Sequence, residues 1–500
     1  MIFPLDEIGF IPLSAAELPL PAAIPGSVRA LAKASPLSHY FMPPTRLLWQ
    51  SETGVTHANT LVSPKPGQAV LKEAAPPATL GAGGAVLLDF GVEIQGYVEL
   101  IIPMTPEKEQ QRRVRIRFGE SAAEAMSELG GAQNAGNDHA MRDQLVSLPW
   151  LGKKMVGPSG FRFVRIDNLE PAIPVQLSQV RAVLQIRDVP YIGSFKCSDA
   201  RLNQIWAVGA YTVHLNMQEY LWDGIKRDRL VWIGDLHPEI STINAVFGFN
   251  EVVPKSLDLI RDVTPPTEWM NGISSYSMWW VIIHEDLWMH YGDRAYLEAQ
   301  QDYMTQLLRR LAEYIGADGA EKLDGTRFLD WPTRANAAAV HEGLQAMMVL
   351  SMKSGARLMR ELGDAETAGI CDNAVARLRK HVPDRSGRKA PAALNVLADL
   401  RGAEQTANEV LKLGGPKDVS TFYGFYVLQA LAQSGDVATA LDFIGAYWGG
   451  MLDLGATTFW EDFDLAWAMN ASRIDALVPA GKDDVHGDFG AYCYIGYRHS

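Results

Sequence analysis

The stretch "GSFKCSDARLNQIWAVGAYTVHLNMQEY", residues 193–220, is where the pattern of apolar residues changes along the chain. Ser198 or Asp199 can accept a hydrogen bond from the backbone of a following helix, as helix-capping residues do. Apolar residues then recur at three- and four-residue steps, which indicates one buried helical stripe. That stripe includes Leu202, Ile205, Trp206 and Tyr211. We therefore expect a helical part of the protein to begin here, at about residue 195.

Before this point, up to about residue 190, the apolar residues alternate with polar ones. In "RVRIRFG" (113–119), arginines alternate with Val114, Ile116 and Phe118, as expected of a strand with one buried face. "YVELIIP" (97–103) and "FRFVRID" (161–167) have the same period. Four glycines are expected to mark turns between these segments: Gly91, Gly96, Gly157 and Gly160. The glycine-rich stretch "GAGGA" (81–85) is also expected to be a turn. Residues 1–190 are thus predicted to form an antiparallel β-sandwich.

After residue 195 the chain contains several long amphipathic segments, many of which end in glycine, a common helix terminator. They include residues 276–292, 295–316, 337–362 and 422–435. Consecutive helical hairpins over residues 195–500 can close into an α/α barrel, but helical periodicity alone does not establish closure.

Composition limits the class of protein. The chain has 500 residues, 47% of them hydrophobic and 21% charged, as in ordinary globular proteins. Its net charge of −13 disfavours nucleic acid and anionic membranes as partners. Neither an export signal nor an apolar run of the roughly 20 residues that span a membrane is recognisable, so we expect a cytoplasmic protein. The three cysteines (Cys197, Cys371 and Cys493) lie far apart in the sequence, so we expect them to be reduced thiols.

Acidic residues are concentrated in "DGIKRDRLVWIGDLHPE", residues 223–239. Asp223, Asp228 and Asp235 are five and seven residues apart, which at about 100° per residue does not place them on one helical face. Gly224, Gly234 and Pro238 predict an irregular backbone, which can bring the three carboxylates to one point. The pattern alone leaves open a solvated loop with local ion pairs. Tryptophan supports a sugar site, because 11 of 13 lie beyond residue 190 and indoles stack on sugars.

A metal cofactor is not predicted. His284 and His290 in "HEDLWMH" are six residues apart, whereas helical zinc ligands are spaced by four. A surface calcium ion is left open.

Four segments together resemble the bacterial α-L-rhamnosidases of glycoside hydrolase family 78. They are "GSFKCSDARLNQIW", "DGIKRDRLVWIGD", "FLDWP" (328–332) and "YWGGMLDLGATTFWEDF" (447–463). "LLDFGVEIQGYVELIIP" (87–103) and "GFRFVRI" (160–166) look like the β-sandwich that precedes the catalytic part in that family. The resemblance implies a six-hairpin (α/α)6 barrel that hydrolyses terminal L-rhamnose with inversion.

The resemblance also implies roles for individual residues. Asp228 stands where the family usually has a general-acid glutamate, and Glu461 matches the general base. Residues that match sugar-binding positions are Asp223, Arg227, Trp232, Asp235, Tyr276, Trp279, Trp331 and His486. Aspartate is one methylene shorter than glutamate, so the acid position departs from the family pattern.

An inverting glycosidase needs one protonated carboxyl group and one carboxylate, about 6.5–9.5 Å apart, so that a water molecule fits between the base and the sugar. Asp223 and Asp235 would raise the pKa of Asp228 by repulsion between like charges. Arg227 would oppose that shift if it paired with Asp228.

Two alternatives remain open. Another six-hairpin exo-glycosidase, such as an unsaturated-uronide hydrolase, would use basic groups such as Lys226, Arg227 and Arg229. A non-catalytic sugar-binding protein would not need the pair Asp228 and Glu461. Because the chain ends soon after the predicted barrel, we expect small imported rhamnosides as substrates. The resemblance makes a homodimer possible.

Overall fold

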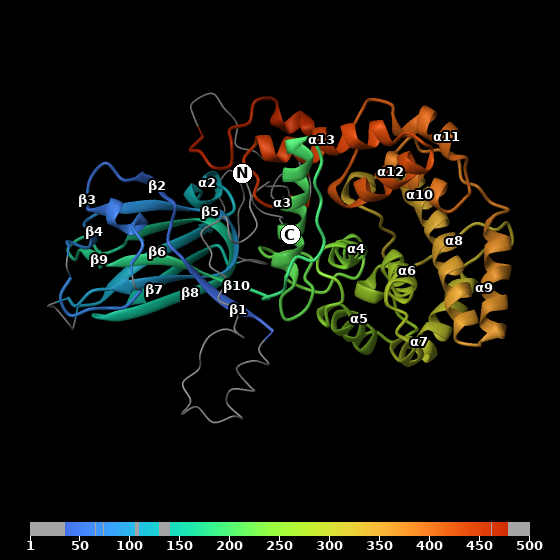
Figure 1. Ribbon diagram of the computed structural model, residues 1–500, viewed down its shortest axis with the longest axis horizontal. Coiled ribbons are helices and arrows are strands. Elements are labelled where there is room, and N and C mark those ends of the chain that lie inside the picture. Colours follow the sequence, from blue (N-terminus) through green and yellow to red (C-terminus); the bar gives the residue numbers. More distant parts are fainter. Residues whose placement is uncertain are drawn as a thin grey trace.

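The computed structural model describes residues 36–65, 67–73, 75–105, 110–129, 141–461 and 463–478. A sheet part, from β1 to β10, and a helical part, from α3 onward, lie side by side along the longest axis (Figure 1). His486 and Cys493, which the sequence analysis singled out, lie outside the described residues. Cys371 is buried and Cys197 is partly exposed, and neither forms a disulfide among the described residues.

The sheet part contains two antiparallel sheets. The larger has the order β1 (Ser38–Met42), β10 (Gln179–Ile186), β5 (Ala85–Ile102), β8 (Gly152–Asn168), β6 (Arg112–Gly119) and β7 (Asp143–Leu148), with β2 (Arg46–Gln50) beside β5. The smaller contains β3 (Val55–Thr56), β4 (Ala78–Leu80) and β9 (Val175–Leu177), near the short helix η1 (Ala58–Val62). Apolar residues of both sheets, such as Leu80 and Val164, belong to one buried core. The two sheets therefore stabilise each other by burying a shared apolar surface.

Glycines in β5 and β8 do not form turns, so this prediction was wrong. Gly91, Gly96 and Gly157 have φ values of 86°, 151° and 141° inside the long strands. The pairing of β5 with β8 shifts register between Asp89 and Ile94 and again after Gly96. Glycine inside a strand commonly marks such a bulge, because it adopts backbone angles that other residues avoid. The predicted turn at residues 81–84 is present, directly before β5.

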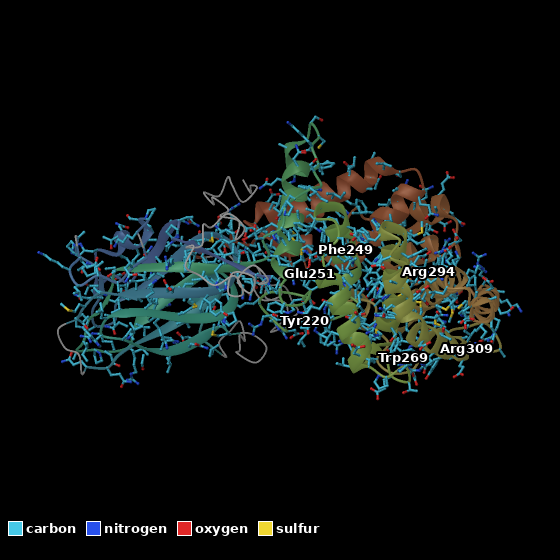
Figure 2. The ribbon with its side chains drawn as sticks, turned by 60° about the horizontal axis from the view of Figure 1, so that its bottom comes forward. Tyr220, Phe249, Glu251, Trp269, Arg294 and Arg309 are labelled. Carbon is cyan, nitrogen blue, oxygen red and sulfur yellow. The ribbon has the colours of Figure 1, made fainter. Side chains whose placement is uncertain are left out.

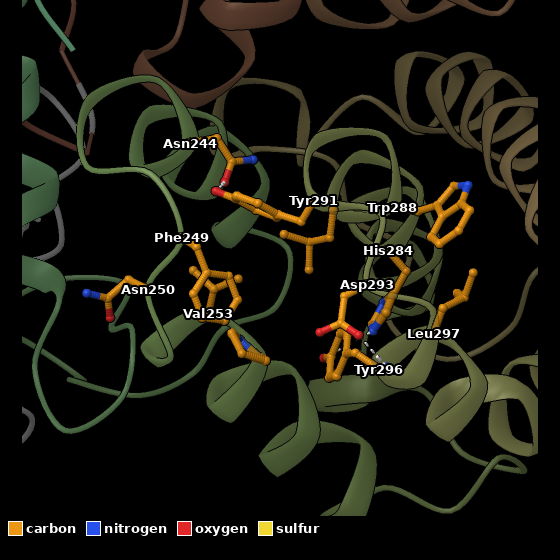
Figure 3. A pocket seen from close by; sticks show the side chains of 12 residues that line it. Asn244, Phe249, Asn250, Val253, His284, Trp288, Tyr291, Asp293, Tyr296 and Leu297 are labelled. Carbon is orange, nitrogen blue, oxygen red and sulfur yellow. Dashed lines mark hydrogen bonds between the residues drawn. The ribbon is translucent and has the colours of Figure 1, made fainter. Parts of the chain in front are cut away.

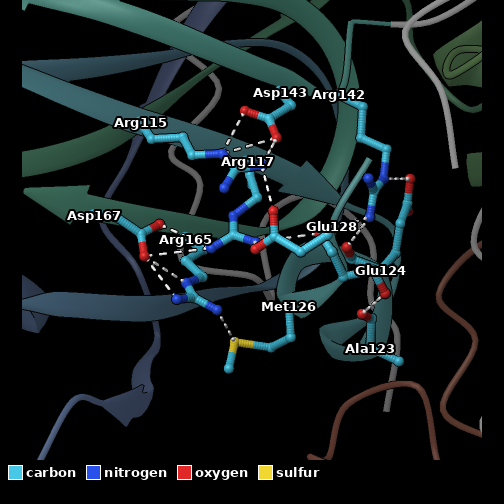
Figure 4. A network of polar contacts seen from close by, with 11 residues as sticks. Arg115, Arg117, Ala123, Glu124, Met126, Glu128, Arg142, Asp143, Arg165 and Asp167 are labelled. Carbon is cyan, nitrogen blue, oxygen red and sulfur yellow. Dashed lines mark hydrogen bonds and ion pairs between the residues drawn. The ribbon is translucent and has the colours of Figure 1, made fainter. Parts of the chain in front are cut away.

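The arginine-bearing face of β6 is covered by a short helix, α2 (Ala122–Met126), and by ion pairs (Figure 4). Val114, Ile116 and Phe118 are fully buried on the opposite face, as the alternation predicts. The ion pairs join Arg115 to Asp143, Arg117 to Asp167 and Glu128, Arg142 to Glu124, and Arg165 to Asp167. The arginine-bearing face is therefore covered around Arg117 while Arg113 remains exposed, and alternation alone does not predict this partial cover.

Each segment predicted to be an amphipathic helix is helical in the structure. These helices are α3 (Ala200–Asn216), α6 (Ser274–Tyr291), α7 (Arg294–Glu313), α8 (Ala337–Glu361) and α12 (Thr421–Gln433). The structure also contains helices that the sequence analysis did not single out: α4 (Leu236–Val246), α5 (Val252–Val263), α9 (Ala365–Leu378), α10 (Lys389–Leu397), α11 (Ala403–Thr406) and α13 (Val437–Asp453). Shorter turns are η2 (Met270–Gly272), η3 (Trp331–Thr333), η4 (Ala407–Leu411) and η5 (Leu465–Met469). Asp199 caps α3 by accepting a hydrogen bond from the backbone of Arg201, as predicted.

Contacts between helices form a continuous series. Helix α3 contacts α4, and the series continues through α6, α8, α10, α12 and α13, which contacts α3 again. One buried apolar cluster extends through these helices. Among the described residues, we find no helix with the length and apolar character needed to cross a membrane.

The two parts meet where β10 ends. Arg187 donates to the Gln218 carbonyl (Nη2 to O 2.8 Å) and forms an ion pair with Glu251 (2.5 Å). Figure 2 shows Glu251 and Tyr220 at the end of the helical part that faces the sheets. This polar junction fixes the segment between α3 and α4 against the sheet part.

Candidate active site

The segment between α3 and α4 contains the carboxylates singled out in the sequence. Asp223 and Leu230 bind each other twice: the Asp223 N–H donates to the Leu230 carbonyl (3.0 Å), and the Leu230 N–H donates to Asp223 Oδ1 (2.9 Å). These bonds close a short loop that carries Asp228 and Arg229. The backbone is irregular here, as predicted, but Pro238 is not part of the irregular segment, because it lies in the first turn of α4. Proline is well tolerated there, since its missing N–H has no helical partner.

Asp228 and Arg229 both have left-handed backbone conformations, with φ values of 44° and 55°. This conformation costs about 1–2 kcal/mol per residue that is not glycine. Such strain persists only where the surroundings hold it, and it is concentrated at functional sites. Arg229 is held by a hydrogen bond from its Nη1 to the Pro158 carbonyl (3.2 Å) in the sheet part.

The structure brings Asp223, Asp228, Asp235 and Glu461 together. Burial raises the pKa of Asp223 well above its usual value, and the charges of Asp235, Asp228 and Glu461 add to that shift. Burial, followed by the charges of Glu461 and Asp228, raises the pKa of Asp235 to about 8. Near pH 7, Asp235 is therefore mostly protonated.

Glu461 lies after α13, more than 220 residues away from the loop, and its side chain is exposed. The indole Nε1 of Trp331 donates a hydrogen bond to Glu461 Oε1 (2.7 Å). Trp331 begins η3, which is fixed by the buried Asp330: its carboxylate accepts hydrogen bonds from Thr333 and from Ser420 Oγ (2.9 Å). The "FLDWP" segment thus orients the carboxylate of Glu461.

Aromatic residues flank the carboxylates. The rings of Trp232 and Tyr276 meet edge to face, with centroids 6.2 Å apart. A Cβ atom on Gly234 would lie 2.1 Å from the Tyr276 ring, so glycine is required for this close approach. Burial and the charges of Asp235 and Glu461 raise the pKa of the Tyr276 hydroxyl well above its usual value, so it remains a hydrogen-bond donor.

Trp279, the other predicted aromatic residue on α6, is only 1% exposed. Its ring stacks on His237 and on Tyr426, with centroids 4.9 Å apart in each case. Trp279 therefore supports the site from the core. Arg227 lies on the loop between Lys226 and Asp228 and is partly exposed.

His237 and Tyr426 are residues that the sequence analysis did not assign to the site. The His237 ring bonds the Tyr426 hydroxyl through Nδ1 (2.8 Å) and Asp286 through Nε2 (2.7 Å). Burial raises the pKa of Glu239 well above its usual value, and the nearby charge of Asp235 adds to the shift. The segments "HPE" and "FYGFY" signal polar and aromatic groups, but only the fold brings them together.

A separate pocket lies between α4, α5, α6 and α7 (Figure 3). Its lining is mainly apolar and aromatic, with His284 and Tyr296 among its polar members. None of the predicted site residues lines it. Among the described residues, no group of three or more histidine, cysteine or acidic side chains is arranged to hold a metal ion.

Part of the chain is similar to known bacterial alpha-L-rhamnosidases. Residues 190–384 match the family model described as the bacterial alpha-L-rhamnosidase 6 hairpin glycosidase domain. An alpha-L-rhamnosidase of Formosa agariphila is 24% identical over 319 residues, which cover 59% of this chain and 32% of that protein. The chain thus spans about a third of the length of this curated relative.

Solved structures share the fold. A Klebsiella oxytoca rhamnosidase with rhamnose bound has a TM-score of 0.71 at 20% identity, covering 93% of each chain. The GH78 family rhamnosidase of Bacillus sp. GL1 has a TM-score of 0.68 at 20% identity, covering 88% of this chain and 47% of that one. Residues 190–384 of this chain are thus similar to the six-hairpin glycosidase domain of bacterial alpha-L-rhamnosidases, and its fold is similar to that of solved rhamnosidases.

Proposed function

We propose that this protein is an inverting α-L-rhamnosidase that removes terminal L-rhamnose from small rhamnosides. The observation that carries the proposal is the gathering of Asp223, Asp228, Asp235 and Glu461 from two segments remote in sequence. The family-model match of residues 190–384 supports the sugar, and the similar Klebsiella oxytoca structure contains bound rhamnose.

In the proposed reaction, Asp228 donates its proton to the glycosidic oxygen while the bond from that oxygen to the anomeric carbon breaks. Glu461 accepts a proton from a water molecule, whose oxygen forms the new bond on the opposite face of the sugar. The products are L-rhamnose of inverted anomeric configuration and the free alcohol of the aglycone. Proton exchange with solvent then restores both groups.

The neighbouring carboxyl groups support this division of roles. The raised pKa of Asp223 and the pKa of about 8 for Asp235 support placing the acid on this side of the site. Glu461 is exposed and accepts the Trp331 hydrogen bond, which suits an ionised base. An acid on the crowded side and a base on the exposed side fit an inverting mechanism.

A neutral sugar is favoured over a uronide by the positions of the basic side chains. Lys226 is fully buried and bonds backbone carbonyls of the sheet part, and Arg229 donates to the Pro158 carbonyl. Two of the three basic groups that could bind a substrate carboxylate are thus engaged elsewhere. The aromatic residues Trp232 and Tyr276 suit the apolar faces of a deoxy sugar.

The proposal includes the architecture expected of the family: a β-sandwich over residues 1–190 and a closed (α/α)6 barrel over residues 195–500. The two sheets with a shared core support the first element. The series of helix contacts that returns to α3 supports the second.

The test is a panel of chromogenic glycosides containing an α-L-rhamnoside, other hexosides and an unsaturated uronide. We expect activity on the rhamnoside, with ¹H NMR detecting the inverted anomer first. Selective uronide cleavage would indicate the alternative hydrolase, and rhamnose binding without turnover would indicate a binding protein. Either result would reject the proposal.

A further inference from the structure

Both segments that carry the proposed catalytic residues are held by contacts with the sheet part. On the Glu461 side, the backbone N–H of Glu93 in β5 donates to Thr457 Oγ1 (2.9 Å). Arg162 in β8 donates to the Gly455 carbonyl (3.1 Å). Thr457 precedes Glu461 by four residues, so these bonds fix the backbone that leads to it.

The loop that carries Asp228 contacts the sheet part through Ile225 and Lys226. Ile225 is fully buried within the apolar core of the sheet part, although it belongs to the loop between α3 and α4. The Lys226 side chain has no exposed surface, and its ammonium group lies 3.3 Å from Glu124 Oε1 and 3.2 Å from the Gly160 carbonyl. Lys226 precedes Asp228 by two residues.

Gly160 in β8 permits this contact. A Cβ atom there would lie 2.9 Å from the Ile225 carbonyl carbon and 2.9 Å from the Lys226 nitrogen. Real Cβ atoms do not approach a backbone so closely, so any side chain at this position would push the loop away. The strand and the loop are therefore fitted to each other through their backbones.

Lys226 lies in a buried cluster of charged and acidic side chains. Glu124 faces two cations, Lys226 and Arg142, each 3.3 Å from Oε1. Burial raises the pKa of the neighbouring Glu93 and Glu120 well above the usual range. Removing the Lys226 ammonium group takes away one of the two cations that Glu124 contacts, together with the hydrogen bond to the Gly160 carbonyl.

We propose that β5 and β8 set the separation between Asp228 and Glu461, with Lys226 as the positioning residue for Asp228. Lys226 does not touch substrate; it acts through the loop backbone, on which Asp228 is held in a left-handed conformation. The role goes beyond the proposed rhamnosidase activity, but its kinetic consequence rests on that activity. A displacement of about 1 Å at a catalytic group costs about 100-fold in rate.

The kinetic test compares Lys226→Met, Lys226→Arg and Gly160→Ala with a control, Lys389→Met. Lys389 is also a buried lysine, whose ammonium donates to the carbonyls of Leu411 (2.8 Å) and Leu413 (2.6 Å), away from the carboxylates. For Lys226→Met we expect kcat to fall about 10- to 100-fold on an alkyl rhamnoside. The loss should be smaller on an aryl rhamnoside, with KM changed less than threefold, because a misplaced acid harms poor leaving groups most.

Hydrogen–deuterium exchange tests the same inference without activity. In Lys226→Met, or in Gly160→Ala if the first variant does not fold, exchange should rise at least tenfold in residues 223–235, and the Lys389→Met variant should leave that segment unchanged. Equal losses on both rhamnosides, or unchanged exchange at 223–235, would overturn the inference. Inactive wild-type protein with the expected exchange pattern would instead reject the proposed function alone.

Discussion

Replacing Asp235 with asparagine should make the protein more stable above neutral pH and less active. Asparagine has nearly the same shape as the protonated aspartic acid, but it carries no charge at any pH. In the wild-type protein, burial and the charges of Glu461 and Asp228 raise the pKa of Asp235 from 3.8 to about 8. The folded protein therefore retains a proton that the unfolded chain releases.

The sign of the effect follows from proton binding. Below about pH 4 both states hold the proton, and between about pH 4 and pH 8 only the folded state does, so the free energy of unfolding falls as the pH rises. One proton changes that free energy by about 1.36 kcal/mol per pH unit, which over about 4 units gives about 6 kcal/mol as an upper bound. Asp235 is partly exposed, and solvent screening reduces this figure. We expect Asp235→Asn to gain about 1–3 kcal/mol at pH 8.

The assay is urea unfolding of both proteins at several values between pH 5 and pH 9. The wild-type protein should lose stability relative to Asp235→Asn as the pH rises, and the difference should level off above about pH 8. Wild-type rhamnosidase activity, measured in parallel, should exceed that of the variant if Asp235 binds the sugar. A difference in stability that does not depend on pH, or that favours the wild-type protein at pH 8, would refute the reasoning.

Three further predictions concern the proposed reaction. Asp228→Asn should lower kcat about 10²- to 10⁴-fold on alkyl rhamnosides and less on aryl rhamnosides, whereas Glu461→Gln should lower kcat on both. Both variants should keep the wild-type melting temperature. Near-wild-type rates for both variants would contradict these roles. Asp228→Glu should not raise kcat/KM on any rhamnoside, and a gain confined to poor leaving groups would mean that Asp228 is a weakened acid. Trp331→Phe removes the indole N–H that donates to Glu461 (2.7 Å). Because a hydrogen bond to a charged group contributes about 1.5–3 kcal/mol, kcat/KM should fall about 10- to 100-fold. An unchanged kcat/KM would show that this hydrogen bond does not orient the base.

Local signals in the sequence predicted five of the helices in the described residues, among them α3 and α8. The cap at Asp199 and the apolar stripe after it depend on residues within one or two turns, and the structure contains both. The spacing of Asp223, Asp228 and Asp235 likewise predicted a non-helical segment, because no regular helix could place them together. These features could be predicted because their physical causes lie close together in the chain.

Features that depend on distant partners were not predicted. Gly91 and Gly96 were predicted to mark turns because glycine is common there, but the pairing of β5 with β8 places them at bulges within a strand. The hydrogen bond between His237 and Tyr426 joins residues 189 positions apart, and neither sequence segment indicates the other. The burial of Lys226 against Gly160 is also a tertiary contact, and without it the lysine resembles a surface charge.

The contacts that hold the loop between α3 and α4 against the sheet part can explain why an aspartate occupies position 228. The reach of a catalytic carboxyl depends on where its Cα atom lies as well as on side-chain length. Here the loop is closed on one side by the paired bonds between Asp223 and Leu230, and it is fixed on the other by Ile225 and Lys226 in the sheet part. A backbone held in this way, with a left-handed turn at Asp228 itself, can carry the Cα atom toward the sugar and replace the missing methylene. The shorter side chain also has one rotatable bond fewer to fix. An aspartate on a loop held in this way can therefore take the place of a glutamate. The correct placement of the Asp228 carboxyl is lost if the loop is released from the sheet.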